Sequence, residues 1–137
     1  MEPYNTNIDS IIIKQDLIGR LLTVHGTVIK NRGLKPIIQK TRAIKAGEIH
    51  ELILTDSIID NNRIINNAAY IGFVVFLTSG LLKNEDKLYI RNNEIGVVIG
   101  FDETHIPNHL NILIYSKKFK TGLDLGLNCG NVVYFIK

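Results

Sequence analysis

The run Ala69–Thr78, which reads Ala-Tyr-Ile-Gly-Phe-Val-Val-Phe-Leu-Thr, restricts the fold of this chain more than any other stretch. Its residues are nearly all β-branched or aromatic, and the pair Ser79-Gly80 ends it. Such residues favour extended backbone, and an apolar run of this kind is typical of a strand that is covered on both faces. The chain is therefore expected to build a β-sheet with this segment inside it.

Several shorter segments also have strand character. Leu22–Lys30 alternates strictly, with Leu22, Val24 and Val28 on one face, which predicts a half-buried strand. Ile37–Lys45 has no clean periodicity and fits either a strand or a loop. The remaining strand candidates are Gly47–Asp56, Lys87–Arg91, Ile95–Phe101, Leu110–Ser116 and Asn131–Ile136.

Short strands at close, regular spacing, with Gly or Asn turns between them, predict an all-β fold. The form expected is a small closed or partly open β-barrel, or a sandwich, with at most one or two short helices. Only Asp9–Leu21 and Ile58–Ile65 would tolerate a helix. A chain of 137 residues with 45% hydrophobic content can bury one ordinary core, so residues 1–137 are predicted to form one domain, with residues 1–7 frayed.

The apolar runs also bear on location. The longest run, Ala68–Leu77, is far shorter than the roughly 20 residues that cross a bilayer, and the N-terminus lacks the basic-then-apolar order of a signal peptide. We therefore expect a cytoplasmic protein without membrane contact. The single cysteine, Cys129, cannot form an internal disulfide and is assigned no role.

The densest group of polar residues lies in Gly100–Tyr115, between two apolar runs, where a strand scaffold usually presents a binding loop. Beyond Pro107, a period of two places Leu110, Ile112 and Ile114 on the core side of a strand and His109, Asn111 and Tyr115 on the other. The candidate ligand-binding residues are Asp102, Glu103, His105, Asn108, His109, Asn111 and Tyr115. The structural alternative is an ordered connection in which Asp102 accepts hydrogen bonds from backbone amides one or two residues later.

A metal site is a second interpretation of the same loop. His105 and His109 have the spacing of two zinc ligands on a helix, but Pro107 between them disfavours a helix, so only a site built from loops remains. His25 and His50, together with Asp102 and Glu103, would complete a set suited to zinc, iron or manganese. No pair of these residues matches a known ligand pattern, so no cofactor is expected. The leading interpretation is a non-catalytic domain that binds a small polar ligand or a protein partner through the loop of residues 102–111. An enzyme that uses acid/base or metal chemistry at this loop stays an alternative.

Two surface features concern partners. Seven cations and no acid lie between Asp16 and Glu48, a pattern that suits phosphate binding but lacks the aromatic residues that stack on bases. Weak anion binding through residues 20–45 is an alternative, and nucleic acid is not the expected partner. The isoleucines Ile58, Ile59, Ile64 and Ile65 would suit burial in a homodimer.

The second half of the chain carries an order of motifs that resembles a known family. Ile90–Lys137 contains Glu-Ile-Gly-Val-Val-Ile-Gly, then Pro-Asn-His-Leu-Asn-Ile-Leu-Ile-Tyr, then Thr121-Gly122, and finally Gly130-Asn-Val-Val-Tyr-Phe. This order resembles the glucitol/sorbitol-specific IIA component of the sugar phosphotransferase system, over about a third of the chain. The resemblance implies a small closed β-barrel and places His109 at a histidine of that family.

The same resemblance fails where that family carries its chemistry. Its phosphorylated histidine lies in a strand reading roughly Phe-Ile-His-Cys-His-Gly, whereas the corresponding stretch here, Gly72–Gly80, contains no histidine. A phosphoryl carrier needs a nucleophilic imidazole, so the resemblance implies the fold rather than the activity. A phosphotransferase-type carrier is kept only as an alternative function.

Overall fold

A computed structural model describes residues 12–58 and 64–137. The described residues contain no helix, and the fold is all-β, as the sequence predicts. Predictions that fall on residues 1–11 and 59–63, such as the frayed residues 1–7 and the contact through Ile59, lie outside the described residues. The strands are β1 (Leu17–Leu21), β2 (Val28–Ile29), β3 (Thr41–Ile44), β4 (Ile49–Thr55), β5 (Ala68–Phe76), β6 (Gly80–Lys83), β7 (Lys87–Ile90), β8 (Asn93–Asp102), β9 (Asn111–Tyr115) and β10 (Val132–Ile136).

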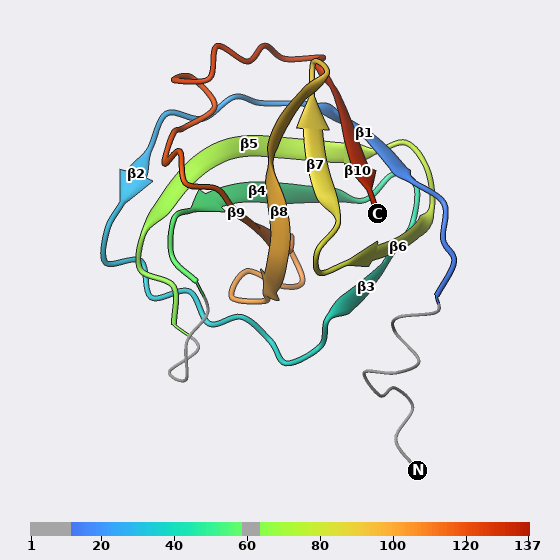
Figure 1. Cartoon of the computed structure of the whole chain (residues 1–137), viewed down its shortest axis with the longest axis horizontal. Helices are drawn as coiled ribbons and strands as arrows, with labels where there is room; N and C mark the ends of the chain where they lie inside the picture. The colour runs from blue at the N-terminus through green and yellow to red at the C-terminus, as the bar shows by residue number, and fades with distance from the viewer. Residues whose placement is uncertain (1–11, 59–63) are drawn as a thin grey trace.

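The largest sheet curls into a partly closed, barrel-like ring (Figure 1). Its hydrogen-bonded neighbours follow the order β1-β10-β7-β8-β9-β4-β5, and β5 also pairs with β1, through Gly19–Leu21 and Val74–Phe76. β2 extends the sheet beyond β5, while β3 and β6 form a separate two-stranded sheet. Strands β4 and β9 are parallel, with Glu51 beside Asn111 and Thr55 beside Tyr115.

Alternate residues of the ring strands point inward and form the main core. β4 contributes Leu52 and Leu54, and the neighbouring β9 contributes Ile112 and Ile114, all almost without exposure. The rings of Phe76 and Phe135 stack across this core with their centroids 5.7 Å apart. The core-facing side predicted for Leu110, Ile112 and Ile114 is therefore confirmed.

A second, smaller apolar cluster covers the outer face of β4, β5 and β9. Ile53, Ala68 and Leu113 point out of the ring and pack against Leu34 and Ile65, which form an isolated β-bridge with each other. This layer explains why β5 is apolar on both faces, as its sequence predicts. It also removes Ile65 from any dimer contact because that residue is fully buried, whereas Ile58 and Ile64 are exposed.

The predicted strand Leu22–Lys30 is mostly wrong. Only Val28–Ile29 is a regular strand, and Leu22 and Val28, predicted to be buried, are 44% and 43% exposed. Residues 22–27 instead follow β5 through separate backbone hydrogen bonds, among them Leu22 N–H to Phe73 O (2.8 Å) and His25 N–H to Ile71 O (2.9 Å). Strand β5 bulges at this point, and its Gly72 (φ 153°) has no side chain, so the carbonyl of Thr23 comes very close to it.

Two strands lie where the sequence predicted none. β1 lies in the stretch that was expected to tolerate a helix, and its residues alternate between buried and accessible positions, which is the period of a strand. β6 begins at Gly80, where the sequence predicted only a break. Within the described residues, no helix of a length and apolarity that would cross a membrane is present.

Candidate functional site

Glu51 is the centre of the candidate site and lies on β4 among apolar residues. Its neighbours His50 and Leu52 point into the ring, so period two turns Glu51 outward, yet it is only 7% exposed. Its Oε2 lies 2.9 Å from Nδ1 of His25, and its Oε1 lies 3.6 Å from Nε2 of His109. One carboxylate therefore stands between two imidazoles, an arrangement called here the His25–Glu51–His109 cluster.

A chain of hydrogen bonds fixes the orientation of His25. The Phe73 N–H donates to Thr23 Oγ1 (2.8 Å), and Thr23 Oγ1 lies 2.9 Å from His25 Nε2. A carboxylate only accepts hydrogen bonds, so the neutral imidazole carries its proton on Nδ1, toward Glu51. Nε2 is then the acceptor, and the Thr23 hydroxyl donates to it. The carboxylate of Glu51 thus sets the tautomer of His25, and the backbone of β5 positions the Thr23 hydroxyl that donates to it.

His109 is buried next to the same carboxylate. Asn108 Nδ2 donates to its Nδ1 (2.8 Å), which leaves the proton on Nε2, facing Glu51. Burial lowers the pKa of His109; Glu51 opposes this shift, and His105 adds to it. Nε2 has no hydrogen-bond partner among the described residues, because the 3.6 Å to Glu51 is too long for one.

Aromatic contacts hold the two imidazoles in place. The ring of Phe73 meets His25 edge-on at 5.3 Å and His109 edge-on at 4.9 Å. On its other side His109 stacks with the exposed His105, with the centroids 5.0 Å apart. Each of the two imidazoles therefore packs against the same aromatic ring, while the side chain of His25 stays 27% exposed.

Arg32 forms the rim of the site. Its Nη2 donates to His105 Nε2 (3.1 Å), and its Nε donates to Tyr70 Oη (2.8 Å). A guanidinium carries only donors, so Tyr70 accepts with its oxygen and keeps its own proton available. The sequence neighbourhood of the loop histidines contains no cation, and it is the fold that brings Arg32 to them.

A cavity of about 360 Å³ opens beside the cluster and is lined by His25, Thr27, Ile29, Glu51 and Tyr70. Its wall combines a carboxylate, an imidazole and a phenol with the apolar side chain of Ile29. A binding site for a small polar ligand needs apolar surface for van der Waals contact and a few polar groups that fix the orientation of the ligand, and this cavity offers both.

The other predicted residues of the loop have structural roles. Asp102 is buried at the end of β8 and accepts from Lys35 N–H (2.9 Å), Thr104 N–H (3.0 Å) and Asn111 Nδ2 (3.1 Å). Burial on its own would raise the pKa of Asp102, but these hydrogen bonds bring the pKa below its ordinary value. The hydrogen bond to the amide two residues later is the one expected for an ordered connection, and Asp102 is not among the residues that line the cavity described above. Glu103 is exposed and pairs with Arg42 at 3.3 Å.

Tyr115 lies away from the cluster, and His50, although it is next to Glu51 in the chain, points to the opposite face of β4. Tyr115 shares a face with His109 as predicted, but six residues along a strand separate them by roughly 20 Å. His50 points into the ring, where its Nδ1 accepts from Leu110 N–H (2.9 Å) and its Nε2 faces Glu48 Oε1 (2.7 Å). Burial lowers the pKa of His50, and the bond to Glu48 opposes that shift. In residues 12–58 and 64–137 no group of three or more His, Cys, Asp or Glu side chains is placed to hold a metal ion.

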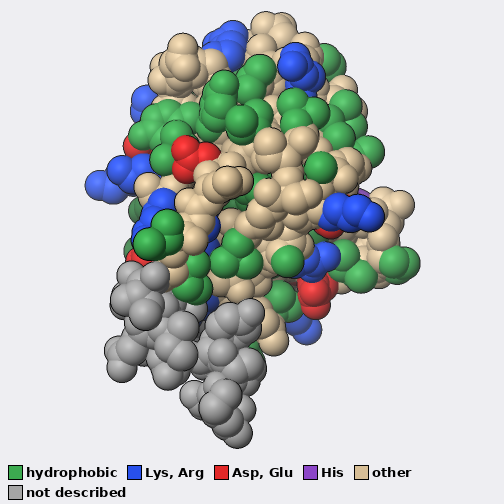
Figure 2. Space-filling view, turned by 90° about the vertical axis from the view of Figure 1, so that its right-hand side faces the viewer, with side chains coloured by type: hydrophobic (Ala, Val, Ile, Leu, Met, Phe, Trp, Pro, Cys, Tyr) green, Lys and Arg blue, Asp and Glu red, His purple; other side chains and the backbone are tan. Residues whose placement is uncertain are grey.

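The cations of residues 20–45 are used in separate places. Arg20 donates to Gly130 O (3.1 Å), Arg32 belongs to the rim of the site, and Arg42 pairs with Glu103. On the face seen in Figure 2, Lys and Arg side chains are scattered rather than gathered into one patch.

Reasoning from the sequence missed Glu51, Arg32, Tyr70 and Thr23. The signal for Glu51 was present: it is an acid directly before the apolar run Leu52–Leu54, on the face that carries Ile53. A charge among buried strand residues is costly and indicates a specific partner. Arg32 and Tyr70 give no such signal, because their positions depend on the packing of residues 22–36 against β5.

Comparisons with known proteins give one match. A family model, described as a family of unknown function (DUF6917), matches residues 11–136, which includes all ten strands. No curated protein and no solved structure matches the chain.

Proposed function

The chain belongs to this family of unknown function, and we propose from the geometry of its site that the domain binds a small polar ligand in the cavity beside the His25–Glu51–His109 cluster. The observation that carries the proposal is Glu51, a carboxylate that is 7% exposed, oriented by His25 and placed at the wall of a cavity. The loop of residues 102–111 supplies His105, Asn108 and His109 to the same region.

The burial of Glu51 supports a function because a structural role would not require it. Removing a carboxylate from water costs several kcal/mol, and a paired buried charge is often no more stabilising than an apolar side chain of similar size. The next outward residue on β4, Ile53, shows that this face of the strand accepts an apolar side chain. Buried charges with directed partners beside a cavity are typical of binding and catalytic sites.

The free polar atoms define the ligand. Glu51 Oε1 makes no hydrogen bond within the described part of the chain, so it can accept one from a ligand. Tyr70 accepts from Arg32 and can therefore donate its own proton. An acceptor and a donor on one small cavity suit a molecule that carries neighbouring hydroxyl groups, or a hydroxyl and an amine. A cavity of about 360 Å³ suits such a molecule better than a protein partner.

A thermal-shift screen of polyols, monosaccharides and amino alcohols tests this proposal. A ligand at about 100 times its dissociation constant stabilises the native state by roughly 2.7 kcal/mol, which gives a clear rise in melting temperature. We expect at least one compound to stabilise the wild type and not Glu51→Gln, which removes the charge and keeps the size.

The matched control is Glu103→Gln, an exposed acid of the 102–111 loop. It should keep the shift. Equal loss in both variants would place the ligand at the tip of the loop, and no shift with any compound would remove the proposal.

Proton transfer to or from the bound ligand is a second candidate function, and the relay Thr23–His25–Glu51 favours it. A carboxylate that orients an imidazole, which in turn accepts from a hydroxyl, is the arrangement that general acid/base chemistry uses. Incubation of a stabilising ligand in heavy water, followed by proton NMR, separates the two functions. Exchange or conversion that needs His25 indicates an enzyme, and an unchanged spectrum indicates a binding domain.

A further inference from the structure

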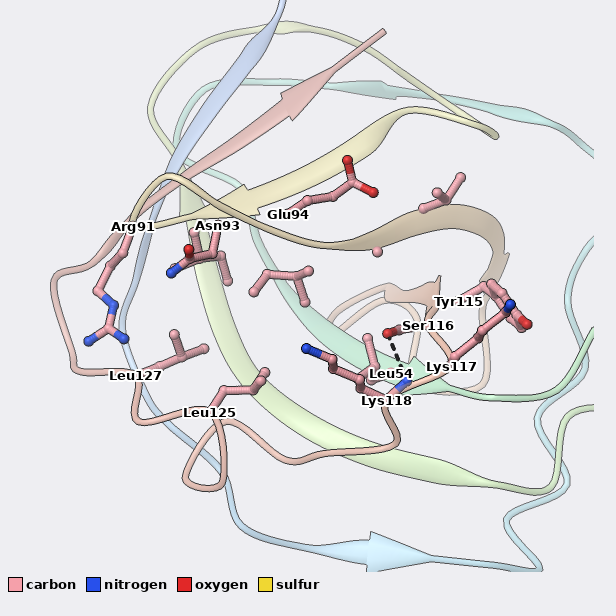
Figure 3. A pocket seen from close by; sticks show the side chains of 14 residues that line it. Leu54, Arg91, Asn93, Glu94, Tyr115, Ser116, Lys117, Lys118, Leu125 and Leu127 are labelled. Atoms are coloured by element: carbon pink, nitrogen blue, oxygen red, sulfur yellow. Dashed lines mark hydrogen bonds between the residues drawn. The ribbon is translucent and has the colours of Figure 1, made fainter.

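A second and larger cavity, of about 570 Å³, lies at the other end of β9. It is bounded by the turn between β7 and β8, by the residues that follow β9, and by the loop 121–127 (Figure 3). Its apolar surface consists of Leu54, Ile90, Ile95, Leu125 and Leu127. Leu54 and Ile90 are nearly unexposed members of the main core and form the floor of the cavity, while Ile95 and Leu125 are partly exposed at its wall.

Cations outnumber acids around this apolar surface. The lining includes Arg91, Lys117 and Lys118 but only one acid, Glu94. The carboxylate of Glu94 accepts a hydrogen bond from Tyr89 Oη (3.1 Å), and this bond raises the pKa of Tyr89. The lining of the cavity therefore carries a net positive charge, because one acid faces three cations.

The basic side chains do not all face the cavity. In Figure 3 the side chain of Lys118 extends across the cavity, whereas the side chain of Lys117 is directed away from its centre. The guanidinium of Arg91 lies at the opposite side, near Leu127, and its Nη1 donates to Gly126 O (3.0 Å). No other hydrogen bond or ion pair of Arg91 occurs within the described residues, so its remaining donors are free for a ligand.

We propose that this cavity binds a small organic anion with an apolar body. Lys118 and Arg91 lie on opposite sides of an apolar surface, so an anionic head can meet one of these cations while its body covers leucine and isoleucine side chains. A neutral apolar molecule would leave the two cations without a partner, and a small inorganic anion would leave the apolar surface exposed. This site does not depend on the proposed function, because it lies at the far end of β9 from His109.

Displacement of anilinonaphthalene sulfonate, a fluorescent aromatic anion, provides the test. The probe is titrated into the folded protein and displaced with octanoate or with octanol, which has the same chain length without the charge. We expect octanoate to displace the probe at a concentration at least about tenfold lower than octanol, since a partly screened charge contact contributes about 1.4 kcal/mol or more. Octanoate binding should also weaken as salt is added.

Matched variants locate the contact. Lys118→Glu should weaken octanoate binding by about tenfold or more, while Lys117→Glu, the same change one residue earlier, should weaken it less than about threefold. Both lysines are exposed, so both variants should fold, which circular dichroism and the melting temperature verify. Equal potency of octanol and octanoate, equal effects of the two variants, or no displacement would each overturn the proposal.

Discussion

The imidazole of His25 and the carboxylate of Glu51 meet at 2.9 Å although they come from segments that do not pair as strands. The contact exists because residues 22–27 lie across the bulge of β5 and bring His25 over the outer face of β4. The position of the candidate site therefore depends on an irregular segment, and several of its properties can be tested by changing single residues.

Glu51→Gln should lower both the stability of the domain and the pKa of His109. In the variant a neutral hydrogen bond from His25 replaces a charge-assisted one, and this difference lowers the free energy of unfolding by about 1 kcal/mol. Glu51 also opposes the lowering of the pKa of His109 by burial, so without the charge that pKa falls further. Urea denaturation gives the first quantity and NMR titration of the His109 ring proton gives the second. An unchanged His109 titration would show that the 3.6 Å contact has no electrostatic effect.

The domain should lose stability as the pH falls from about 8 to about 5, through the ordinary histidine pKa of about 6.5. Burial lowers the folded-state pKa values of His50 and His109, so the unfolded state binds more protons in this range. The stabilising contribution is complete above the unfolded pKa and disappears as the pH falls through the folded pKa. Free energies of unfolding measured across the range should fall, and the fall should be smaller in His109→Asn. A constant stability would contradict this assignment.

Asp102→Asn should destabilise the domain by about 2–3 kcal/mol. Three donors bond to the two carboxylate oxygens of Asp102, and in asparagine one of these oxygens becomes an NH₂ group, which cannot accept a hydrogen bond. The lowered pKa of Asp102 adds an acid dependence. Its contribution is present above the unfolded pKa of about 3.9 and is lost as the pH falls through the lower folded value. Denaturation should be measured for the wild type and the variant between about pH 5 and pH 2. The difference between their free energies of unfolding should shrink only at the acid end of this range.

Gly72→Ala should cost far more than Gly33→Ala. A methyl group at Gly72 would collide with the carbonyl of Thr23, so residues 22–25 would have to move away from β5, and a cost of roughly 3–5 kcal/mol is expected. Gly33 has a positive φ of 71° but no atom near the position of the added methyl, so only the backbone strain of about 1 kcal/mol applies. Chemical denaturation of both variants gives the comparison. Similar losses would mean that the close approach at Gly72 is not required.

The protein should remain unlabelled when it is incubated with phosphoenolpyruvate and the general phosphotransferase components. A phosphoryl group on His25 or His109 would face the carboxylate of Glu51, which repels it. His105 is exposed next to Arg32, but it lies on a loop and has no strand neighbours that would hold a phosphorylated imidazole in place. Stoichiometric phosphohistidine that His105→Ala or His109→Ala abolishes would contradict this prediction.

The regular strands were predictable from the sequence, because their apolar runs and period-two patterns reflect burial directly. β5, β8 and β9 are within a few residues of their predicted bounds. The prediction of a regular strand over Leu22–Thr27 was wrong. The apolar and polar residues alternate there, but the segment bonds to β5 only at separate points and forms no regular ladder. β1 was missed because five residues are too few to distinguish an alternating strand from the first turns of a helix.

The candidate site was predictable only in part. Concentrated polar residues directed attention to the loop that carries His105 and His109, and the structure places His25 and His109 beside the same carboxylate. The same pattern included Asp102, whose polar atoms are all used inside the protein, and Tyr115, which shares a face with His109 but not a location. Glu51 and Arg32 enter the site through the closure of the ring and the path of residues 22–36, which no local pattern encodes.

Strand β10 occupies the ring between β1 and β7, which precede it in the chain by many residues. Until residues 132–136 have emerged from the ribosome, both neighbours present unpaired N–H and C=O groups along one edge. Open strand edges and long-range pairing favour association between incomplete chains. The order of strands in the sheet therefore differs from the order of their synthesis. A nascent chain of this domain needs protection at the edges of β1 and β7 until β10 has been made and pairs with both.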